Sequence, residues 1–440
     1  MKNILIIIFL FLEFKSTAQK ISTFRYSKVY FNDEWRFIDQ KGDFFLEKEI
    51  GKDKIENLCV SNGLAITFDG TKYGFMDFNG IQIVPNMYED VSCFQFGFAS
   101  AKINQRWGLI DMANIFVIDP KYDLIGPVGV DGVVPVVNNE KLGLIDTKGY
   151  IISDFKYSWF PNITPQIIPP IFTNGLLPIF KPDSIQNFLN WKLGYIDSKG
   201  NLKINTDFEF RGTLPYFFNG RANVAKNGVQ VVIDTLGNVI PTSKLNNKAI
   251  LFHEGFSTIA DENGKQGIIN DNGQIILDPI YNGVNPFSEE FAAIQIGLNN
   301  TGGVISAFVN KKGEFVFDKK FGLIRDFNEG FAAVEVNGKW TYIDNKGNYL
   351  IEPQFDVTDF FSEGLGMFGV KKGKNLKFGF LNNMGKVVIE PIYNEVKDFK
   401  FGLAPVKVGN KFGFINNKGE MVIKPKFQNA FSFIEEEIIK

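Results

Sequence analysis

Apolar and polar residues alternate in short runs along most of this chain, and the runs recur. In the run FAAVEV, residues 331–336, Ala332, Val334 and Val336 alternate with Ala333 and Glu335. A period of two residues is typical of a half-buried β-strand. An Asn-Gly or Gly-Asn pair then follows in the better-kept copies, and such pairs accept the positive φ angles of a two-residue hairpin turn. The pattern therefore predicts β-hairpins.

A second turn closes each hairpin, as in Asp344-Asn345-Lys346-Gly347. The Asp side chain can accept hydrogen bonds from the backbone of the turn, and Gly takes the left-handed position. A third apolar run ends at a proline, which cannot donate to a sheet. Each unit is predicted to be a three-stranded meander, followed by a connection that carries Tyr or Phe and ends in Phe-x-Glu-Gly, as in residues 327–330.

The unit is repeated along the chain. Residues equivalent to Asp344 lie 34 to 40 positions apart, with one step of 51, and they are Asp39, Asp77, Asp111, Asp146, Asp197, Asp234, Asn270, Asn310, Asp344, Asn382 and Asn416. Periods of this size are typical of solenoids, propellers and arrays, in which each unit buries its apolar face against its neighbours. The sequence predicts an all-β tandem array of about eleven three-stranded β-meander repeats, as an open, superhelical solenoid. The alternative is a closed propeller-like ring.

Three of the copies read RWGLID (106–111), KYGFMDFNG (72–80) and KFGFINNKG (411–419). This motif of an aromatic residue, Gly, an apolar pair, Asp or Asn and a later Gly resembles the WG-repeat family of bacterial proteins, over residues 35–427. The family Trp is kept only at Trp35, Trp107 and Trp340, and the Gly of the pair is replaced at four positions, which are Arg36, Val231, Ala307 and Thr341. The resemblance implies an all-β repeat protein, commonly bacterial and often exported, without a defined enzyme chemistry.

The N-terminus predicts a signal peptide over residues 1–18, followed by the repeat array over 19–440. Lys2 precedes an apolar run at 4–12, and Ser16-Thr17-Ala18 offers small residues for cleavage. The run is too short to span a membrane, which takes about 20 residues. We expect an exported protein, in the periplasm, at the cell surface or secreted, with no transmembrane segment after signal removal.

A proline-rich insertion at 156–192 interrupts the repeats. Four aromatic residues flank or lie within it, namely Trp159, Phe160, Phe188 and Trp191. The segment can be a packing loop that covers an imperfect repeat. Alternatively, it is a recognition loop whose four aromatic side chains bind a partner, since binding residues often lie on loops over a rigid scaffold.

The two cysteines, Cys59 and Cys93, are 34 residues apart, which is one repeat. They occupy the same position in adjacent units, four residues before Gly63 and Gly97. Neighbouring units should bring the two thiols close together, so a disulfide is one interpretation. Unpaired thiols in the core are the other.

Composition narrows the classes of function. The net charge of −2 provides no field that would hold a phosphate backbone, so we expect no nucleic-acid partner. His253 is the only histidine, in the variable position of a turn, and we expect it on the surface. The Asp-x-x-Gly turns lack the spaced carboxylates of a calcium loop. Glu254, Glu289, Glu329 and Glu363 recur in one position of the unit, which favours a structural role in a turn. No catalytic residue, metal or cofactor is predicted.

These features favour an exported non-enzymatic binding or scaffold protein whose partner is a protein or glycan at the cell envelope. One alternative is a hydrolase that acts on the cell wall or on carbohydrate. The other is a purely structural component of the envelope.

Overall fold

The computed structural model describes residues 21–45, 60–61, 63–77, 81–159, 170–181, 191–210, 215–240 and 252–439. Within these ranges every regular element is a β-strand, and all paired strands are antiparallel. The predicted all-β class is therefore confirmed. The signal peptide predicted at 1–18 lies outside the described residues.

The repeated element is a β-hairpin, and the described ranges contain eleven, one for each copy found in the sequence. The hairpins are β1 (Ile21–Phe31) with β2 (Glu34–Asp39), β5 (Leu64–Phe68) with β6 (Tyr73–Asp77), β9 (Phe98–Ile103) with β10 (Arg106–Asp111), β13 (Val133–Asn138) with β14 (Lys141–Asp146), β16 (Leu177–Lys181) with β17 (Lys192–Ile196), β19 (Arg221–Lys226) with β20 (Val229–Asp234), β22 (Phe256–Ala260) with β23 (Gln266–Asn270), β26 (Phe291–Leu298) with β27 (Val304–Asn310), β28 (Phe331–Val336) with β29 (Lys339–Asp344), β31 (Leu365–Lys372) with β32 (Asn375–Asn382), and β35 (Leu403–Val408) with β36 (Lys411–Asn416).

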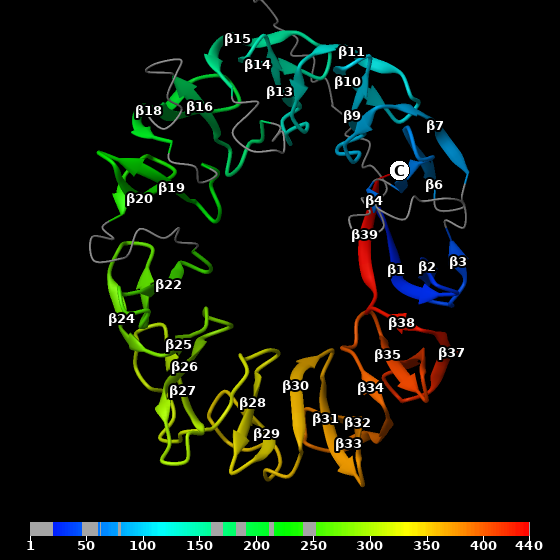
Figure 1. Ribbon diagram of the computed structural model, residues 1–440, viewed down its shortest axis with the longest axis vertical. Helices are drawn as coiled ribbons and strands as arrows, with labels where there is room; N and C mark the ends of the chain where they lie inside the picture. The colour runs from blue at the N-terminus through cyan, green and yellow to red at the C-terminus, as the bar shows by residue number, and fades with distance from the viewer. Residues whose placement is uncertain are drawn as a thin grey trace, which may run out of the picture.

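A third strand pairs with the second strand of most hairpins and lies at the periphery (Figure 1). These outer strands are β3 (Phe44–Phe45), β7 (Gln82–Tyr88), β11 (Phe116–Tyr122), β15 (Ile151–Ser158), β18 (Leu202–Glu209), β21 (Val239–Ile240), β24 (Ile275–Tyr281), β33 (Val387–Tyr393) and β37 (Met421–Phe427). Several carry a proline, for example Pro85 in β7 and Pro425 in β37. Proline on an edge strand opposes pairing with another chain.

A short strand on the inner side completes many units, and the meander alone does not predict it. These inner strands are β4 (Val60–Ser61), β8 (Asp90–Val91), β12 (Leu124–Ile125), β25 (Gly283–Val284), β30 (Val357–Ser362), β34 (Glu395–Val396) and β38 (Asn429–Ala430). The Tyr or Phe expected in the connection ends the outer strand in five copies, at Tyr88, Tyr122, Tyr281, Tyr393 and Phe427. The chain then passes directly from the outer strand of one unit to the inner strand of the next.

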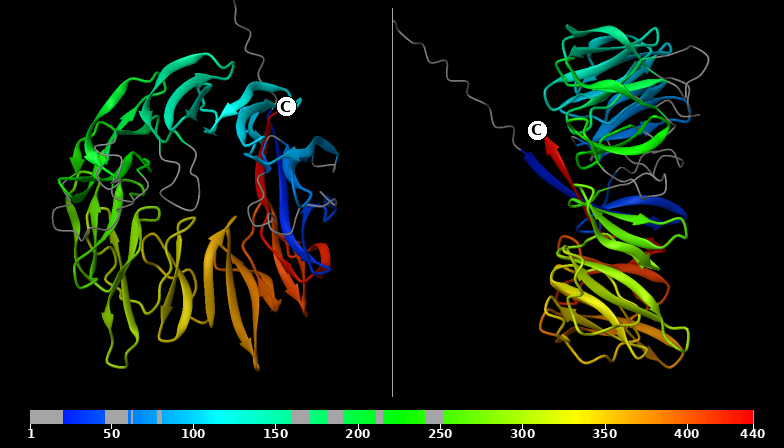
Figure 2. Two further views of the ribbon diagram at one scale, coloured as in Figure 1. Left: turned by 45° about the horizontal axis from the view of Figure 1, so that its top comes forward. Right: turned by 90° about the vertical axis from the view of Figure 1, so that its left-hand side faces the viewer.

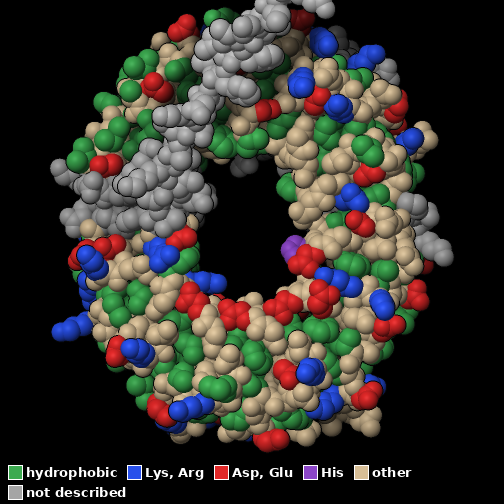
Figure 3. All heavy atoms as spheres, turned by 180° about the vertical axis from the view of Figure 1, so that it is seen from behind, with side chains coloured by type: hydrophobic (Ala, Val, Ile, Leu, Met, Phe, Trp, Pro, Cys, Tyr) green, Lys and Arg blue, Asp and Glu red, His purple; other side chains and the backbone are tan. Residues whose placement is uncertain are grey.

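The units follow one another around an open bore, and the first and last of them meet (Figures 1 and 3). The sheets stay small and separate, except that β12 to β21 form one continuous ten-stranded sheet. The predicted tandem array is thus confirmed. Its units curve as in a solenoid, and the two ends of the array pair with each other. This closed arrangement is the one that the ring alternative predicted.

The ring closes because strands from the end of the chain complete the first unit. β1 pairs with β38 through Val29 and Tyr30, and with β39 (Ile434–Ile439) through its first six residues, Ile21 to Tyr26. The Ser27 hydroxyl donates to the backbone oxygen of Phe431 at 2.7 Å. β1 and β39 project together from one face of the ring (Figure 2).

The WG motif requires a glycine because the outer strand passes close to this position. A Cβ atom on Gly108 would lie 2.5 Å from the backbone oxygen of Ile118, and one on Gly194 would lie 2.7 Å from that of Ile204. The register shifts beside these glycines, as a β-bulge does, and brings the outer strand close.

Two copies without this glycine pair differently with the third segment. Beside Ala307 and Thr341 the pairing is through isolated bridges, at Ser306, Val309, Trp340 and Ile343. The Thr341 hydroxyl donates to the backbone oxygen of Ile351.

Candidate binding groove on the inner rim

The Phe-x-Glu-Gly segments form tight turns next to the bore. The third residue of each turn has a positive φ, for example 49° at Asn219, 51° at Glu254, 58° at Glu289 and 52° at Glu329. Asn adopts this left-handed conformation more readily than Glu does. An additional interaction therefore has to hold the glutamates in place.

That interaction is a bond between units. The Glu329 carboxylate accepts hydrogen bonds from the backbone N–H groups of Glu363 and Gly364 at 2.8 Å each. Glu363 accepts in the same way from Phe401 at 2.5 Å and Gly402 at 2.8 Å. The structural role predicted for these recurring glutamates is confirmed.

The residue before three of these glutamates makes a second bond to the next unit. The Ser288 hydroxyl donates to the backbone oxygen of Phe327 at 2.6 Å, and the Asn328 amide donates to that of Phe361 at 2.7 Å. Ser362 continues the series with a bond to Phe399 at 2.6 Å. Consecutive turns are thus fixed in a row, and the row forms a preorganised surface.

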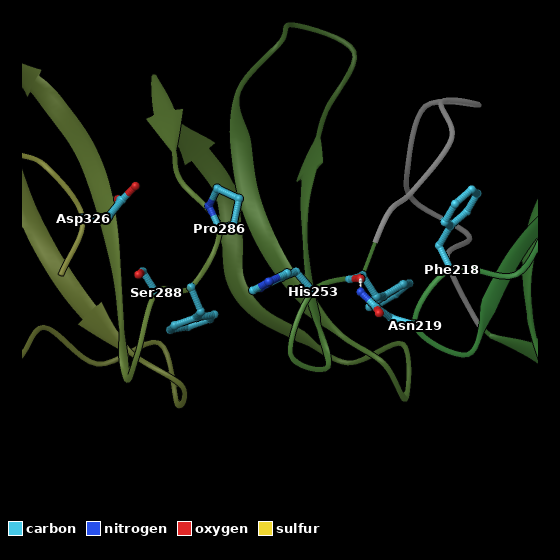
Figure 4. Close-up of a pocket in the computed structure, with 8 residues that line it drawn as sticks. Phe218, Asn219, His253, Pro286, Ser288 and Asp326 are labelled. Carbon is cyan, nitrogen blue, oxygen red and sulfur yellow. Dashed lines mark hydrogen bonds between the residues drawn. The ribbon is translucent and has the colours of Figure 1, made fainter. Parts of the chain in front are cut away.

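A groove of about 580 Å³ runs along this row. It is lined by equivalent turns of four consecutive units, and the lining residues are Phe218, Asn219, Phe252, His253, Pro286, Phe287, Ser288 and Asp326. Figure 4 shows the labelled side chains side by side, from Phe218 at one end to Asp326 at the other. Its volume lies within the range of small-molecule and peptide sites, about 300–1,000 Å³.

Aromatic rings form the floor of the groove and one of its ends. Phe252 and Phe287 are each 3% exposed and belong to the core, whereas Phe218 is 52% exposed. An exposed aromatic ring above a rigid turn is available for contact with a partner. The sequence could have indicated Phe218 as a site residue, because it fills the same variable position of the turn as His253.

Polar groups lie between these rings. The Asn219 amide donates to the backbone oxygen of Phe252 at 2.9 Å, the dashed line in Figure 4. Asp326 accepts from the Asn285 amide at 2.8 Å, which leaves its second carboxylate oxygen for a ligand. His253 is exposed, as predicted, and no described residue pairs with its imidazole.

Among the described residues around the groove, carboxylates outnumber cations. Figure 3 shows Asp and Glu side chains in a row along part of the inner rim. Glu254 and Glu289 directly follow lining residues in sequence, and Glu290 follows Glu289. Lys311 is shared between Glu254 at 3.5 Å and Glu290 at 3.2 Å. Farther along the ring, burial and the nearby carboxylate of Asp359 raise the pKa of Asp398. The inner rim is therefore an acidic surface.

Two of the four aromatic residues predicted as a recognition surface, Trp159 and Trp191, lie outside the groove. Trp159 and Trp191 are 4% and 8% exposed and belong to one core cluster, where the Trp159 ring packs edge-on against Phe180 at 5.7 Å. This burial removes both rings from the surface, because the core of these units takes them up. Phe160 and Phe188 lie outside the described residues.

The structure describes only one of the two cysteines. Cys93 is disulfide-bonded, and Cys59 lies outside the described residues. The Cys59–Cys93 pair stays a prediction.

In the described ranges, no group of three or more His, Cys, Asp or Glu side chains is placed to hold a metal ion. None of the described segments is a helix with the length and apolar character needed to cross a membrane.

Comparison with known proteins supports the repeat assignment. Six stretches match the family described as WG containing repeat, at residues 107–141, 267–297, 307–340, 340–375, 378–412 and 412–439. No curated protein matches significantly. The chain is an all-β protein built from tandem hairpin repeats around a bore. It belongs to the WG-repeat family.

Solved structures resemble the chain at low scores. A eukaryotic initiation factor matches with a TM-score of 0.39 and 9% identity, over 85% of this chain and 97% of that one. BamB from Moraxella catarrhalis gives 0.27 and 12%, over 68% and 98%. The computationally designed Ika8 protein gives 0.28 and 12%, over 66% and 95%.

Proposed function

We propose that this protein is an exported, non-enzymatic binding or scaffold protein that holds its partner in the groove of the inner rim. The observation that carries the proposal is the origin of the lining residues, which come from four consecutive units at equivalent positions. A surface of this kind presents contacts at regular intervals along the array. The inter-unit bonds of Ser288 and Glu289 keep it rigid, which lowers the entropic cost of binding.

The groove supports binding better than catalysis. A serine nucleophile needs a base within hydrogen-bond reach. The Ser288 hydroxyl instead donates to the backbone oxygen of Phe327 at 2.6 Å, so it is committed to the fold. The remaining lining is largely apolar with a few polar groups, as is common in binding sites.

Export is supported by residues 1–18, whose basic start, apolar run and small residues are the pattern of a secretory signal. Partners at the envelope, whether protein or glycan, follow from that location. N-terminal sequencing of the mature protein should find a start at or near Gln19. Intact Met1 on the functional protein would contradict export by this signal.

The binding role is tested by quantitative pull-down from envelope fractions of cells that express the protein. Phe218→Ala removes an exposed ring of the groove. Phe315→Ala is the matched control, because Phe315 is 53% exposed, against 52% for Phe218, and does not line the groove. We expect a partner that the wild type and the control retain and Phe218→Ala loses. Equal recovery by all three proteins would contradict the groove and favour a purely structural role. Turnover of cell-wall glycan by the purified protein would favour the hydrolase.

A further inference from the structure

We propose that the occupant of the groove is a basic, apolar polypeptide segment, that is, an extended chain in which Lys or Arg alternates with aliphatic residues. This inference rests on the proposed binding function and names the chemistry of the partner.

The shape of the groove is the first argument. The lining residues come from four units in chain order, so the groove extends along the rim (Figure 4). A compact ligand would contact one or two units. An extended chain can place a side chain against each unit in turn, because its side chains also repeat at regular spacing.

The lining is the second argument. Phe218 and Pro286 are exposed and Phe252 and Phe287 lie beneath them. Apolar side chains of a peptide gain about 25 cal/mol for each Å² that they bury on such a surface. A ligand made only of charged groups, such as a short polyamine, would leave these rings unused.

Charge complementarity is the third argument. Asp326 lines the groove, and Glu254, Glu289 and Glu290 flank it. Two cations near it in the described part of the chain are already paired. Lys311 bonds Glu254 and Glu290, as described above, and Arg325 lies 3.4 Å from Asp359.

A third cation, Arg221, stacks over the Phe252 ring and lies 3.1 Å from Asp271. It is therefore also neutralised. The described residues in and around the groove carry net negative charge, which favours association with a cationic chain and disfavours an anionic one.

The test uses the full mature chain and fluorescence anisotropy. The probes are three labelled decapeptides of alternating sequence, Lys-Leu, Glu-Leu and Ser-Leu, together with a labelled chitin oligosaccharide. We expect the Lys-Leu peptide to bind about tenfold more tightly than the Ser-Leu peptide at low salt. This advantage should shrink as the ionic strength rises from about 0.05 M to about 0.5 M.

Variants then locate the binding. Phe218→Ala and Asp326→Asn should each weaken Lys-Leu binding about fivefold or more. Phe315→Ala and Asp318→Asn should leave it unchanged, because these exposed residues do not line the groove. Circular dichroism confirms that each variant is folded.

The outcomes separate the two proposals. The groove binds a ligand, but the basic class is wrong, if another probe binds at least as tightly as the Lys-Leu peptide and binds Phe218→Ala more weakly than the wild type. These other probes are the Ser-Leu peptide, the Glu-Leu peptide and the oligosaccharide. If Lys-Leu binding is unaffected by both groove variants, the assigned site is wrong. If no probe binds and the pull-down does not respond to Phe218→Ala, both the inference and the binding function fail.

Discussion

Glu329 of one unit accepts a hydrogen bond at 2.8 Å from the backbone N–H of Glu363, which holds the same position in the next unit. Glu363 therefore donates to the preceding unit and, through its own carboxylate, accepts from the following one. The repetition of glutamate at this position is a device for joining neighbours. Glu289, in one of the turns that line the groove, accepts in the same way from the backbone N–H of Gly330.

Glu329→Ala should lower the free energy of unfolding by about 2 kcal/mol, because two N–H groups lose a charged acceptor. Glu352→Ala is the control, since Glu352 is exposed and its carboxylate has no described partner. Urea denaturation followed by circular dichroism measures both. Identical midpoints for the two variants would show that the inter-unit bond adds no stability.

Gly413→Ala should destabilise the last unit by about 1–3 kcal/mol, the usual cost of forcing atoms into a filled space. Its Cβ would contact the backbone oxygen of Ile423 and lie 2.8 Å from the nitrogen of Pro425. Gly297→Ala should be tolerated, because nothing lies within 4 Å of its Cβ. Thermal unfolding of both variants is the measurement, and a stable Gly413→Ala protein would overturn our explanation of the WG glycine.

Deletion of residues 428–440 should destabilise the first unit, far away in sequence. It removes β38 and β39 and leaves β1 with an unpaired edge. Hydrogen exchange should then increase in β1 and β2 more than in β22 and β23, on the opposite side of the ring (Figure 1). Unchanged protection of β1 would mean that these strand pairings do not form in solution.

Acid should weaken the fold through carboxylates held in the ionised form. A hydrogen bond from the Lys339 side chain, and then one from the Lys371 backbone, lower the pKa of Asp356 below its ordinary 3.8. The stability that this gives is complete above pH 3.8 and is lost as the pH falls through the lower folded-state pKa. Asp356→Asn should therefore lose less stability than the wild type between about pH 5 and about pH 2. Parallel pH profiles of Tm would contradict this assignment.

Non-reducing mass spectrometry should find one linked peptide that contains Cys59 and Cys93. A disulfide between units would close a loop of more than 30 residues and stabilise the folded protein by about 3–4 kcal/mol. Reduction should lower Tm accordingly. Two thiols that alkylate without prior reduction would contradict the pairing.

The sequence predicts the repeating parts of this fold because they depend on local chemistry. Asp344 accepts from the backbone N–H groups of Lys346 and Asn348 at 2.9 Å, as its Asp-x-x-Gly turn indicates. Asn337 and Gly338 both adopt positive φ, as a two-residue hairpin requires. The conformation of such a turn is determined by four or five consecutive residues, so the sequence pattern is sufficient to predict it.

The rest depends on residues that are distant in sequence. An inner strand of two residues, such as β8, is too short to show a period. Phe218 and Asp326 are more than a hundred positions apart and join one groove only because the units curve. Trp159 shows the opposite case, since an aromatic ring beside a proline-rich segment has the same sequence signature in a core as on a surface.

The pairing of β1 with β38 and β39 has a consequence for biosynthesis. The first unit to leave the ribosome stays incomplete until the last one arrives, so circular assembly is necessarily a late event. A chain that gained or lost one repeat would have to change its curvature at every joint before its ends could meet. Selection on this protein therefore acts on the number of copies as well as on their content.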